Sequence, residues 1–327
     1  MKLQIKNYLS LIKFSHTIFA MPFALIGFFL ALFNPSFAFV PGINKAIFIP
    51  GFYNSQWNLN RTIGWGWDYT NYVWWKWIVV KFLLVILCMI FARSAAMAFN
   101  RFLDRKWDAL NPRTAIREIP KGIITPKNAL TFTIINCVLF IATTYFINRI
   151  CFLLSPVALA VVLGYSYTKR FTPLCHLILG LGLSLAPIGA YLAVTGVFHW
   201  LPILFSFAVL FWVSGFDIIY ALQDVEFDRS QNLYSIPAWL GKEKALQVSE
   251  VLHLLSAGCI VAAGKLGAFG PLYWLAAIVF IGCLIYQHAI VKPHDLRRVN
   301  LAFMTTNGVA SVVFAILVIA DLFTNNS

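Results

Sequence analysis

The chain has 327 residues, of which 60% are hydrophobic and 11% are charged. This composition lies outside the range of soluble domains and excludes a soluble globular protein. The formal net charge is +13, but its basic residues alternate with apolar stretches in a way that argues against binding to nucleic acid.

Several apolar stretches reach about 20 residues, the length that an α-helix needs to cross a bilayer. Uninterrupted apolar runs exclude the alternation of a transmembrane barrel, and the first run is too long for a cleavable signal peptide. We therefore predict an all-α, polytopic membrane protein with nine spans. The predicted spans are 8–33, 73–99, 128–147, 151–168, 174–197, 200–222, 245–264, 271–291 and 299–322.

The segment 34–72 separates the first two predicted spans and is rich in Trp, Tyr, Asn, Gly and Pro. Such aromatic residues usually anchor a protein at the membrane interface, and substrate gating is the alternative. Most other links are short, which favours one helical bundle. We expect a single transmembrane domain, 1–327, in which 34–72 is an inserted, non-cytoplasmic loop.

The distribution of basic residues predicts the orientation of the chain. With the N-terminus inside, 18 Lys and Arg residues fall on one side of the membrane and six on the other. This bias follows the positive-inside rule. It places the links 100–127 and 217–244, which contain the two acidic motifs, on the cytoplasmic side.

The first acidic motif ends the second predicted span. Asn100, Asp104 and Asp108 lie four residues apart, and each step of four turns an α-helix by only ~40° beyond one full turn. The three side chains therefore share one helix face, which we expect to point into the bundle. Carboxylates in such a position are costly and usually functional.

The second acidic motif ends the sixth predicted span. Asp224 and Asp228 lie seven and eleven residues after Asp217, offsets that return within ~20° of the starting direction on an α-helix. Hard oxygen ligands of this kind suit Mg2+, which binds through one or two carboxylates and phosphate oxygens. The alternative is that these acids only balance nearby Arg and Lys on solvated faces. The presence of two phased sets favours the metal site.

Basic residues beside both motifs predict a phosphate ligand, because Arg binds phosphate oxygens in a bidentate manner and Lys offers a compact charge. Arg93 lies about two turns inside a span, where it either reaches phosphate or forms a buried structural pair. The candidates for ligand contact are Arg101, Arg105, Arg113, Arg117, Lys169 and Arg170, with Tyr165 just before the last two.

Several motifs together resemble a known family. They are Ser15–Phe23, Arg93–Ser94, Asn100–Asp108, Asn111–Gly122, Tyr165–Arg170, Asp217–Asp228 and Ser235–Pro237. These runs closely resemble the UbiA family of membrane prenyltransferases. The resemblance covers nearly the whole chain except 34–72, where the family usually has a short loop.

The resemblance implies a bundle of nine transmembrane helices around a central cavity, with Mg2+ as cofactor. It further implies transfer of a polyprenyl group from polyprenyl diphosphate to a hydroxylated aromatic acid. The acceptor would be 4-hydroxybenzoate or a dihydroxynaphthoate, in ubiquinone or menaquinone biosynthesis. Such an enzyme would be an integral protein of the inner (cytoplasmic) membrane of a bacterium, with its active site facing the cytoplasm.

The resemblance also implies roles for single residues. Asp217 would hold or deprotonate the acceptor hydroxyl, and Arg170 would meet the acceptor carboxylate or the diphosphate. His16 would touch the acceptor or be structural, and the other histidines have no evident partner in the sequence. The implied metal ligands are Asn100, Asp104, Asp108, Asp224 and Asp228, and the implied diphosphate ligands are Arg101, Arg105, Tyr165 and Lys169.

An ion-coupled secondary transporter is the alternative function. Transport sites usually lie near the bilayer midplane, at interrupted helices. The acids here lie at helix ends beside residues that suit phosphate, so prenyl transfer is the leading hypothesis.

Overall fold

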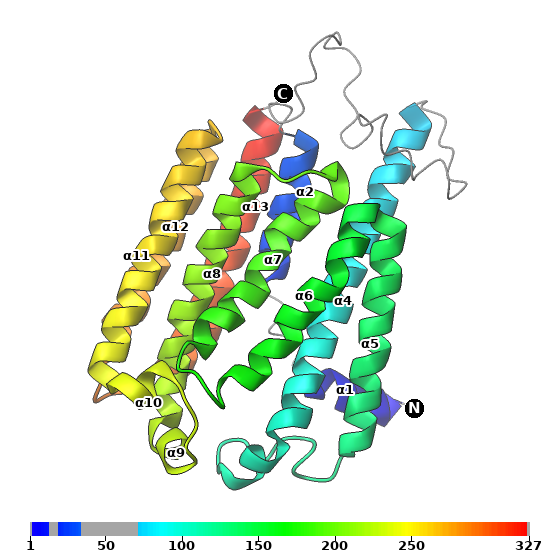
Figure 1. Ribbon diagram of the computed structural model, residues 1–327. Helices are drawn as coiled ribbons and strands as arrows, with labels where there is room; N and C mark the ends of the chain where they lie inside the picture. Colours follow the sequence, from blue (N-terminus) through cyan, green and yellow to red (C-terminus); the bar gives the residue numbers. More distant parts are fainter. Residues whose placement is uncertain (1, 13–18, 34–70, 326–327) are drawn as a thin grey trace.

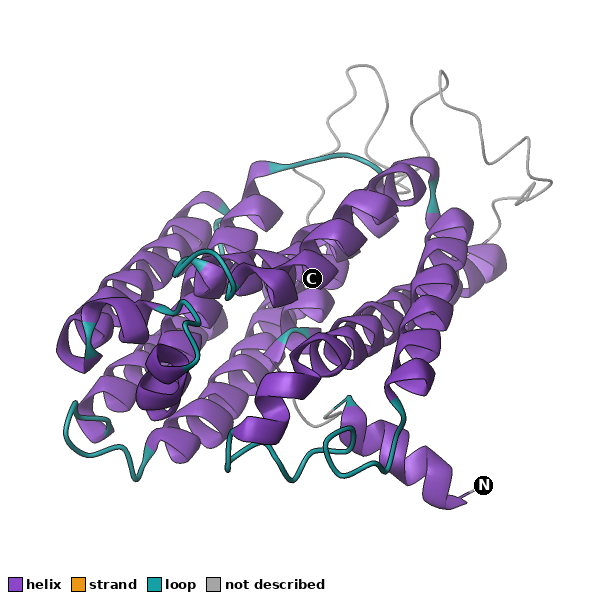
Figure 2. Ribbon diagram, turned by 60° about the horizontal axis from the view of Figure 1, so that its bottom comes forward, coloured by secondary structure: helices purple, strands orange, loops and turns teal. Residues whose placement is uncertain are grey.

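The computed structural model describes residues 2–12, 19–33 and 71–325 as a bundle of long helices (Figure 1). Eight helices within this part of the chain are long and apolar enough to cross a membrane. The same residues form no strand. Figure 2 shows these helices and their connecting loops with the lower end of Figure 1 turned forward. These observations confirm the predicted all-α, polytopic membrane fold.

The first half of the bundle contains α1 and α2, followed after the undescribed residues by α4, α5 and α6. Of the predicted first span, the end of α1 and all of α2 are described, whereas 13–18 lie outside the described residues, as does most of 34–72. These helices span Lys2–Leu11 (α1), Met21–Phe33 (α2), Asn71–Leu110 (α4), Pro126–Ile147 (α5) and Arg149–Thr168 (α6).

The second half begins with α7 and α8. After α8 the chain continues through a short 3-10 turn, η3, into the short helices α9 and α10, and a π-helical turn, η4, precedes α13. Their bounds are Cys175–Thr195 (α7), Trp200–Ala221 (α8), Leu222–Asp224 (η3), Val225–Ser230 (α9), Ile236–Leu240 (α10), Lys242–Leu266 (α11), Pro271–Ile290 (α12), Leu301–Thr306 (η4) and Asn307–Asn325 (α13).

Helix boundaries follow from capping residues. Thr125 accepts a hydrogen bond from the backbone N–H of Asn128, and Pro126 opens α5. Asn148 ends α5 and begins α6, where its side chain accepts from the backbone N–H of Cys151. These caps provide acceptors for free backbone N–H groups at the helix starts. Asn148 can therefore be the only residue between α5 and α6.

The two acidic motifs lie at the same end of the bundle. The loop from α4 to α5 and the short helices α9 and α10 are found together at the lower end in Figure 1. The helices meet there because α4 packs on α5 and α6, while α7 packs on α6, α8 and α2. Both motifs therefore share one end of the bundle, as the alternation of spans predicts, and the assignment of that end to the cytoplasm stays a prediction.

Polar contacts inside the bundle join helices that are distant in sequence. The indole N–H of Trp212 donates to Oδ1 of Asn307 at 2.9 Å, and the amide of Gln287 donates to the same oxygen at 2.8 Å. These contacts link α8, α12 and α13 within a core of buried aromatic rings. Interhelical hydrogen bonds of this kind stabilise packing where lipid removes the hydrophobic driving force.

Close packing of α7 on α8 depends on Gly180. A Cβ atom at this position would lie 2.5 Å from the backbone oxygen of Leu210 and 2.3 Å from Oγ of Ser214. Small residues allow membrane helices to approach in this way. The contact matters for function because α7 and α8 both contribute to the cavity described below.

We expect Gly180→Ala to destabilise the protein by about 1–3 kcal/mol, the usual cost of overpacking. Thermal unfolding of the purified protein in detergent would show a lower apparent Tm. Gly189→Ala is the matched control, because Gly189 lies on the same helix and a Cβ there meets nothing within 4 Å. An equal Tm for the two variants would contradict this account of α7–α8 packing.

Candidate active site

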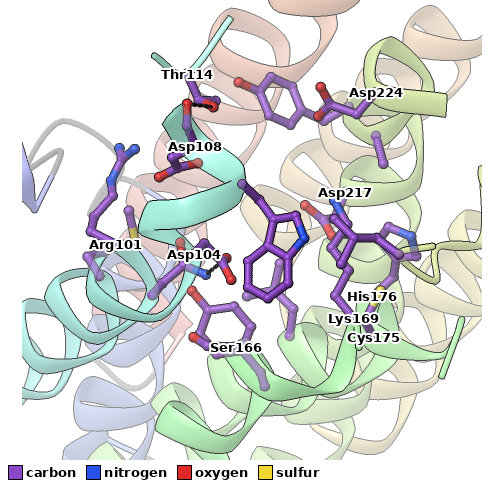
Figure 3. Close-up of a pocket in the computed structure, with 18 of the residues that line it drawn as sticks. Arg101, Asp104, Asp108, Thr114, Ser166, Lys169, Cys175, His176, Asp217 and Asp224 are labelled. Carbon is purple, nitrogen blue, oxygen red and sulfur yellow. Dashed lines mark hydrogen bonds and ion pairs between the residues drawn. The ribbon is translucent and has the colours of Figure 1, made fainter. Parts of the chain in front are cut away.

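A cavity of about 290 Å³ lies between α4, α6, α7 and α8, near the end of the bundle that carries the acidic motifs. Its walls include the labelled side chains in Figure 3, which come from these helices, from η3, from the turn after α6 and from the loop after α4. One part of the wall is charged, and another part is apolar. The predicted central cavity is therefore present.

The first acidic motif lies on the last turns of α4, as the four-residue spacing predicts. The amide of Asn100 donates to Oδ2 of Asp104 at 3.0 Å, so the two side chains share one helix face. Asp108 follows one turn later and is buried. All three residues line the cavity.

The second acidic motif does not stay on one uninterrupted helix. The 3-10 turn η3 lies between Asp217 and Asp228, and such a turn has 3.0 residues per turn instead of 3.6. The three acids consequently make separate contacts. Asp217 and Asp224 line the cavity, whereas Asp228 is fully buried behind the wall.

The loop between α4 and α5 connects the two motifs. Arg113 forms a bidentate ion pair with Asp224, in which Nε donates to Oδ1 at 3.1 Å, and its Nη1 donates to the hydroxyl of Tyr220 at 2.6 Å. Arg117 donates to Oδ1 of Asp108 at 2.5 Å. Two arginines of this loop therefore form ion pairs with the two motifs: Arg117 with Asp108 on α4, and Arg113 with Asp224 on η3.

Asn111, at the start of the same loop, strengthens the connection because its amide donates to Oδ1 of Asp224 at 3.2 Å. Burial alone would lower the pKa of Arg113, but Asp224 and Tyr220 raise it above its ordinary value. Arg113 is thus a permanent cation beside the cavity.

Lys169 reaches the second motif from the end of α6. Its Nζ lies 2.7 Å from Oδ1 of Asp228, and Oγ of Ser235 donates to the other oxygen of that carboxylate at 2.9 Å. Burial is the largest single influence and lowers the pKa of Lys169, but the charge and hydrogen bond of Asp228 together with the charges of Asp224 and Cys175 raise it above the ordinary value. Lys169 lines the cavity as a charged ammonium group.

Arg170 lies between α4 and the end of α6. Its guanidinium is 3.5 Å from Oδ1 of Asp104 and donates to the backbone oxygen of Leu103 at 3.2 Å. It also covers the rings of Trp107 and Tyr167, with centroid distances of 4.7 and 4.5 Å. These contacts hold a planar, bidentate donor at the cavity wall.

Two of the predicted site residues do not line the cavity. Arg105 donates to the backbone oxygen of Phe102 at 2.6 Å and lies over the ring of the same residue. It therefore faces away from the position predicted for diphosphate. Asp228, as noted above, reaches the site only through Lys169 and Ser235.

Arg93, Arg101 and Tyr165 line the cavity as well. The Nε atoms of both arginines, and Nη1 of Arg101, are buried without a hydrogen-bond partner in the described part of the chain. Arg93 also forms no ion pair there. These observations favour ligand contact over a structural pair for Arg93. His16, the other residue left open, lies outside the described residues.

Sequence reasoning missed His176. This buried residue of α7 lines the cavity, and its Nδ1 lies 2.7 Å from Oδ2 of Asp217 on α8. The partners are 41 positions apart, so helical spacing gives no sign of the contact. The one sign in the sequence is that a histidine in an apolar, membrane-spanning segment is energetically costly and usually has a polar partner.

The charges around the cavity favour an anionic ligand. Six basic residues line it, against four acidic ones. The basic residues are Arg93, Arg101, Arg113, Arg117, Lys169 and Arg170, and the acidic residues are Asp104, Asp108, Asp217 and Asp224.

The acids that line the cavity also fit a divalent cation. Oδ2 of Asp108 is buried and has no hydrogen-bond partner among the described residues. Within that part of the chain, no group of three or more His, Cys, Asp or Glu residues is placed to hold a metal. Mg2+ suits such a site because it binds through few carboxylates and takes its remaining ligands from phosphate and water.

Curated proteins of known name match most of this chain. The 4-hydroxybenzoate octaprenyltransferase of Nitrosomonas eutropha is 31% identical over 234 residues, covering 71% of this chain and 81% of the relative. The enzyme of the same name from Aeromonas hydrophila is 26% identical over 243 residues, covering 74% and 83%.

Solved structures show the same fold. The apo structure of a UbiA homolog from Aeropyrum pernix K1 has a TM-score of 0.70 and 26% identity, covering 95% of this chain and 98% of that one. A UbiA homolog from Archaeoglobus fulgidus bound to DMAPP and Mg2+ has a TM-score of 0.68 and 19% identity, covering 97% and 99%. The sequence model of the UbiA prenyltransferase family matches residues 61–309. This chain therefore belongs to the UbiA prenyltransferase family.

Proposed function

We propose that the protein transfers a polyprenyl group from polyprenyl diphosphate to the ring of a hydroxylated aromatic acid, with Mg2+ as cofactor. Relatives named 4-hydroxybenzoate octaprenyltransferase make 4-hydroxybenzoate the first acceptor to consider, with a dihydroxynaphthoate as the alternative. The product would be a precursor of ubiquinone or menaquinone. Membership of a prenyltransferase family supports this enzyme over an ion-coupled transporter.

The observation that carries the proposal is a cavity with a charged end and an apolar wall. Its apolar lining includes Phe19, Met97, Leu179, Leu183, Val213, Phe216 and Phe303. An isoprenoid diphosphate has the same division into a charged head and an apolar tail. The cavity can therefore receive both parts of that substrate, with the head among the Arg and Lys residues.

The acidic residues would supply the ligands for two Mg2+ ions. Asn100, Asp104 and Asp108 would hold one ion, and Asp224 and Asp228 would hold the other. Asp228 would first have to release Lys169, because that ion pair now occupies its carboxylate. When bound there, Mg2+ would supply positive charge to offset the charge that develops on the departing diphosphate.

The basic residues bind the diphosphate itself. Arg101 has buried donors without partners in the described residues, and Lys169 stays protonated beside the cavity. Arg113 and Arg117 now pair with the acids that we assign to the metal. Their long side chains would be free to contact phosphate oxygens once a cation binds those acids. Tyr165 adds a hydroxyl group to the same wall.

The chemical step needs a leaving anion and an aromatic nucleophile. The bond between the allylic carbon and the diphosphate oxygen breaks, and diphosphate leaves with the electron pair. A ring carbon of the acceptor then bonds to the allylic cation and loses its proton. The fixed cations around the cavity stabilise the leaving group, because they are oriented before the reaction begins.

The acceptor binds on the side of Asp217 and Arg170. Asp217 offers a carboxylate to the acceptor hydroxyl, and Arg170 offers a bidentate donor to the acceptor carboxylate or to diphosphate. Both residues line the cavity, and Asp217 comes from α8 whereas Arg170 comes from the turn after α6. A hydroxylated aromatic acid carries the two groups that complement this pair.

The bias of basic residues supports a cytoplasmic active site. With the acidic motifs on the side richer in Lys and Arg, substrates and Mg2+ would enter from the cytoplasm. We therefore place this integral membrane protein in the inner membrane of a bacterium. We further propose that 1–327 forms one prenyltransferase domain with 34–72 as an inserted non-cytoplasmic loop.

We expect Asp104→Asn and Asp224→Asn each to lower kcat by about 10²–10³-fold, the usual effect of removing one group that stabilises a transition-state charge. Prenyl transfer would be measured with labelled polyprenyl diphosphate and Mg2+. Glu226→Gln is the matched control, because this exposed acid lies two residues from Asp224 and does not line the cavity. Full activity in both aspartate variants would contradict the metal assignment.

Chelation provides a second test of the same site. EDTA should abolish transfer by the wild-type enzyme, and added Mg2+ should restore it. Mn2+ binding, followed by electron paramagnetic resonance, should weaken in Asp104→Asn and stay unchanged in Glu226→Gln. Mn2+ bound equally by all three proteins would place the metal elsewhere.

A panel of aromatic acids tests the acceptor assignment. We expect transfer to 4-hydroxybenzoate or to a dihydroxynaphthoate, and a much lower rate with benzoate, because benzoate has no hydroxyl group for Asp217. Product formation would be followed by mass spectrometry. Equal rates with 4-hydroxybenzoate and benzoate would contradict the role of Asp217.

A further inference from the structure

The contact between His176 and Asp217 has a defined direction. The backbone N–H of Ile236 points at Nε2 of His176 at 3.4 Å. A backbone N–H can only donate, so Nε2 accepts and the proton of a neutral ring lies on Nδ1. Nδ1–H consequently donates to Oδ2 of Asp217 at 2.7 Å.

This hydrogen bond leaves half of the Asp217 carboxylate for a ligand. Oδ2 is used by His176, and Oδ1 has no hydrogen-bond partner in the described part of the chain. The Asp217 side chain is 23% exposed and lines the cavity, whereas that of His176 is 3% exposed. Figure 3 shows the two labelled residues side by side at the cavity wall. Oδ2 of Asp217 is thus hydrogen-bonded to the buried His176, while Oδ1 is left for a ligand in the cavity.

Two segments besides its own helix, α8 and the start of α10, hold His176 in place. Its backbone oxygen accepts from Oγ of Ser214 on α8 at 3.1 Å, and its ring meets the first residue of α10. The residue before Ile236 is Ser235, whose side chain caps α10 and also bonds to Asp228. His176 therefore sits in a rigid part of the wall.

We propose that His176 is a positioning residue for the acceptor: it fixes the Asp217 carboxylate so that Oδ1 receives the hydroxyl group of a phenolic substrate. The terminal torsion of an aspartate is soft, so a carboxylate without a fixed partner takes several orientations. A donor on Oδ2 removes that freedom before the acceptor binds. This inference rests on the proposed function and adds a residue to its acceptor side.

The same segment links the acceptor side to the diphosphate side. The backbone N–H of Tyr234 donates to the carbonyl of Lys169 at 2.7 Å. Two residues later, the backbone N–H of Ile236 donates to His176. Lys169 in turn pairs with Asp228. Segment 234–236 therefore sets the position of both the acceptor-holding pair and the diphosphate-binding lysine.

The test compares His176→Leu with His176→Asn, because the asparagine amide takes the place of Nδ1–H. We expect His176→Leu to raise the KM for 4-hydroxybenzoate by about 10- to 100-fold, the factor for a lost hydrogen bond to a charged group. The KM for polyprenyl diphosphate should change less than about twofold, and His176→Asn should recover most of the loss. His294→Leu is the control, since His294 is highly exposed and does not line the cavity.

A spectroscopic measurement tests the contact without turnover. In wild-type protein labelled with ¹⁵N-histidine, the signal that disappears in His176→Asn should show protonated Nδ1 and unprotonated Nε2. Asp217→Asn should shift the Nδ1 proton. A ring without a proton on Nδ1 would overturn the proposal.

The kinetic outcomes separate this inference from the proposed function. An active wild type, with equal changes in both KM values or no recovery in His176→Asn, would contradict the positioning role alone. A wild-type protein that prenylates no phenolic acid in the panel would contradict the proposed function and the positioning role together.

Discussion

The site depends on the pairing of acids at the ends of membrane-spanning helices with cations from the connections between helices. Asp108 and Asp224 lie on different segments, and each pairs with an arginine of one loop, Arg117 and Arg113. Both arginines are partly exposed, so breaking either pair should cost more than the about 0–1 kcal/mol of a surface pair and less than the about 3–5 kcal/mol of a fully buried one. The loop after α4 is therefore tied to both motifs at once.

This pairing has a functional consequence as well as a structural one. The acids that suit Mg2+ are the same groups that hold the arginines, and the arginines suit phosphate. If a metal ion bound the carboxylates and a diphosphate bound the arginines, each arginine–carboxylate pair would be replaced by a metal–carboxylate contact and an arginine–phosphate contact. Under the proposed function the cavity would hold a metal and a diphosphate together, which would account for its excess of basic residues.

Local periodicity was enough to predict one part of the site. Asn100 and Asp104 share a face because α4 continues unbroken to Leu110. The family resemblance adds Arg105 beside them as a diphosphate ligand. Arg105 shares its helix face with Arg101, one turn earlier, which lines the cavity. The side chain of Arg105 nevertheless contacts Phe102 and does not line the cavity. Proximity in sequence to a motif does not imply a common direction.

The remaining differences arise from tertiary structure. The 3-10 turn η3 interrupts the helix that was expected to align Asp217 with Asp228, and it directs these acids to different partners. His176 acquires its role from the packing of α7 on α8, which no spacing in the sequence records. The apolar runs predicted the helical bundle, because membrane spans have strong compositional signals. The family resemblance added its central cavity.

The most direct measurement is an experimental structure of the protein with Mg2+ and an unreactive polyprenyl diphosphate analogue. The account predicts metal density beside Asp104 and Asp224, with Arg113 and Arg117 moved from the carboxylates to phosphate oxygens. A diphosphate bound elsewhere, with both of those ion pairs intact, would contradict it.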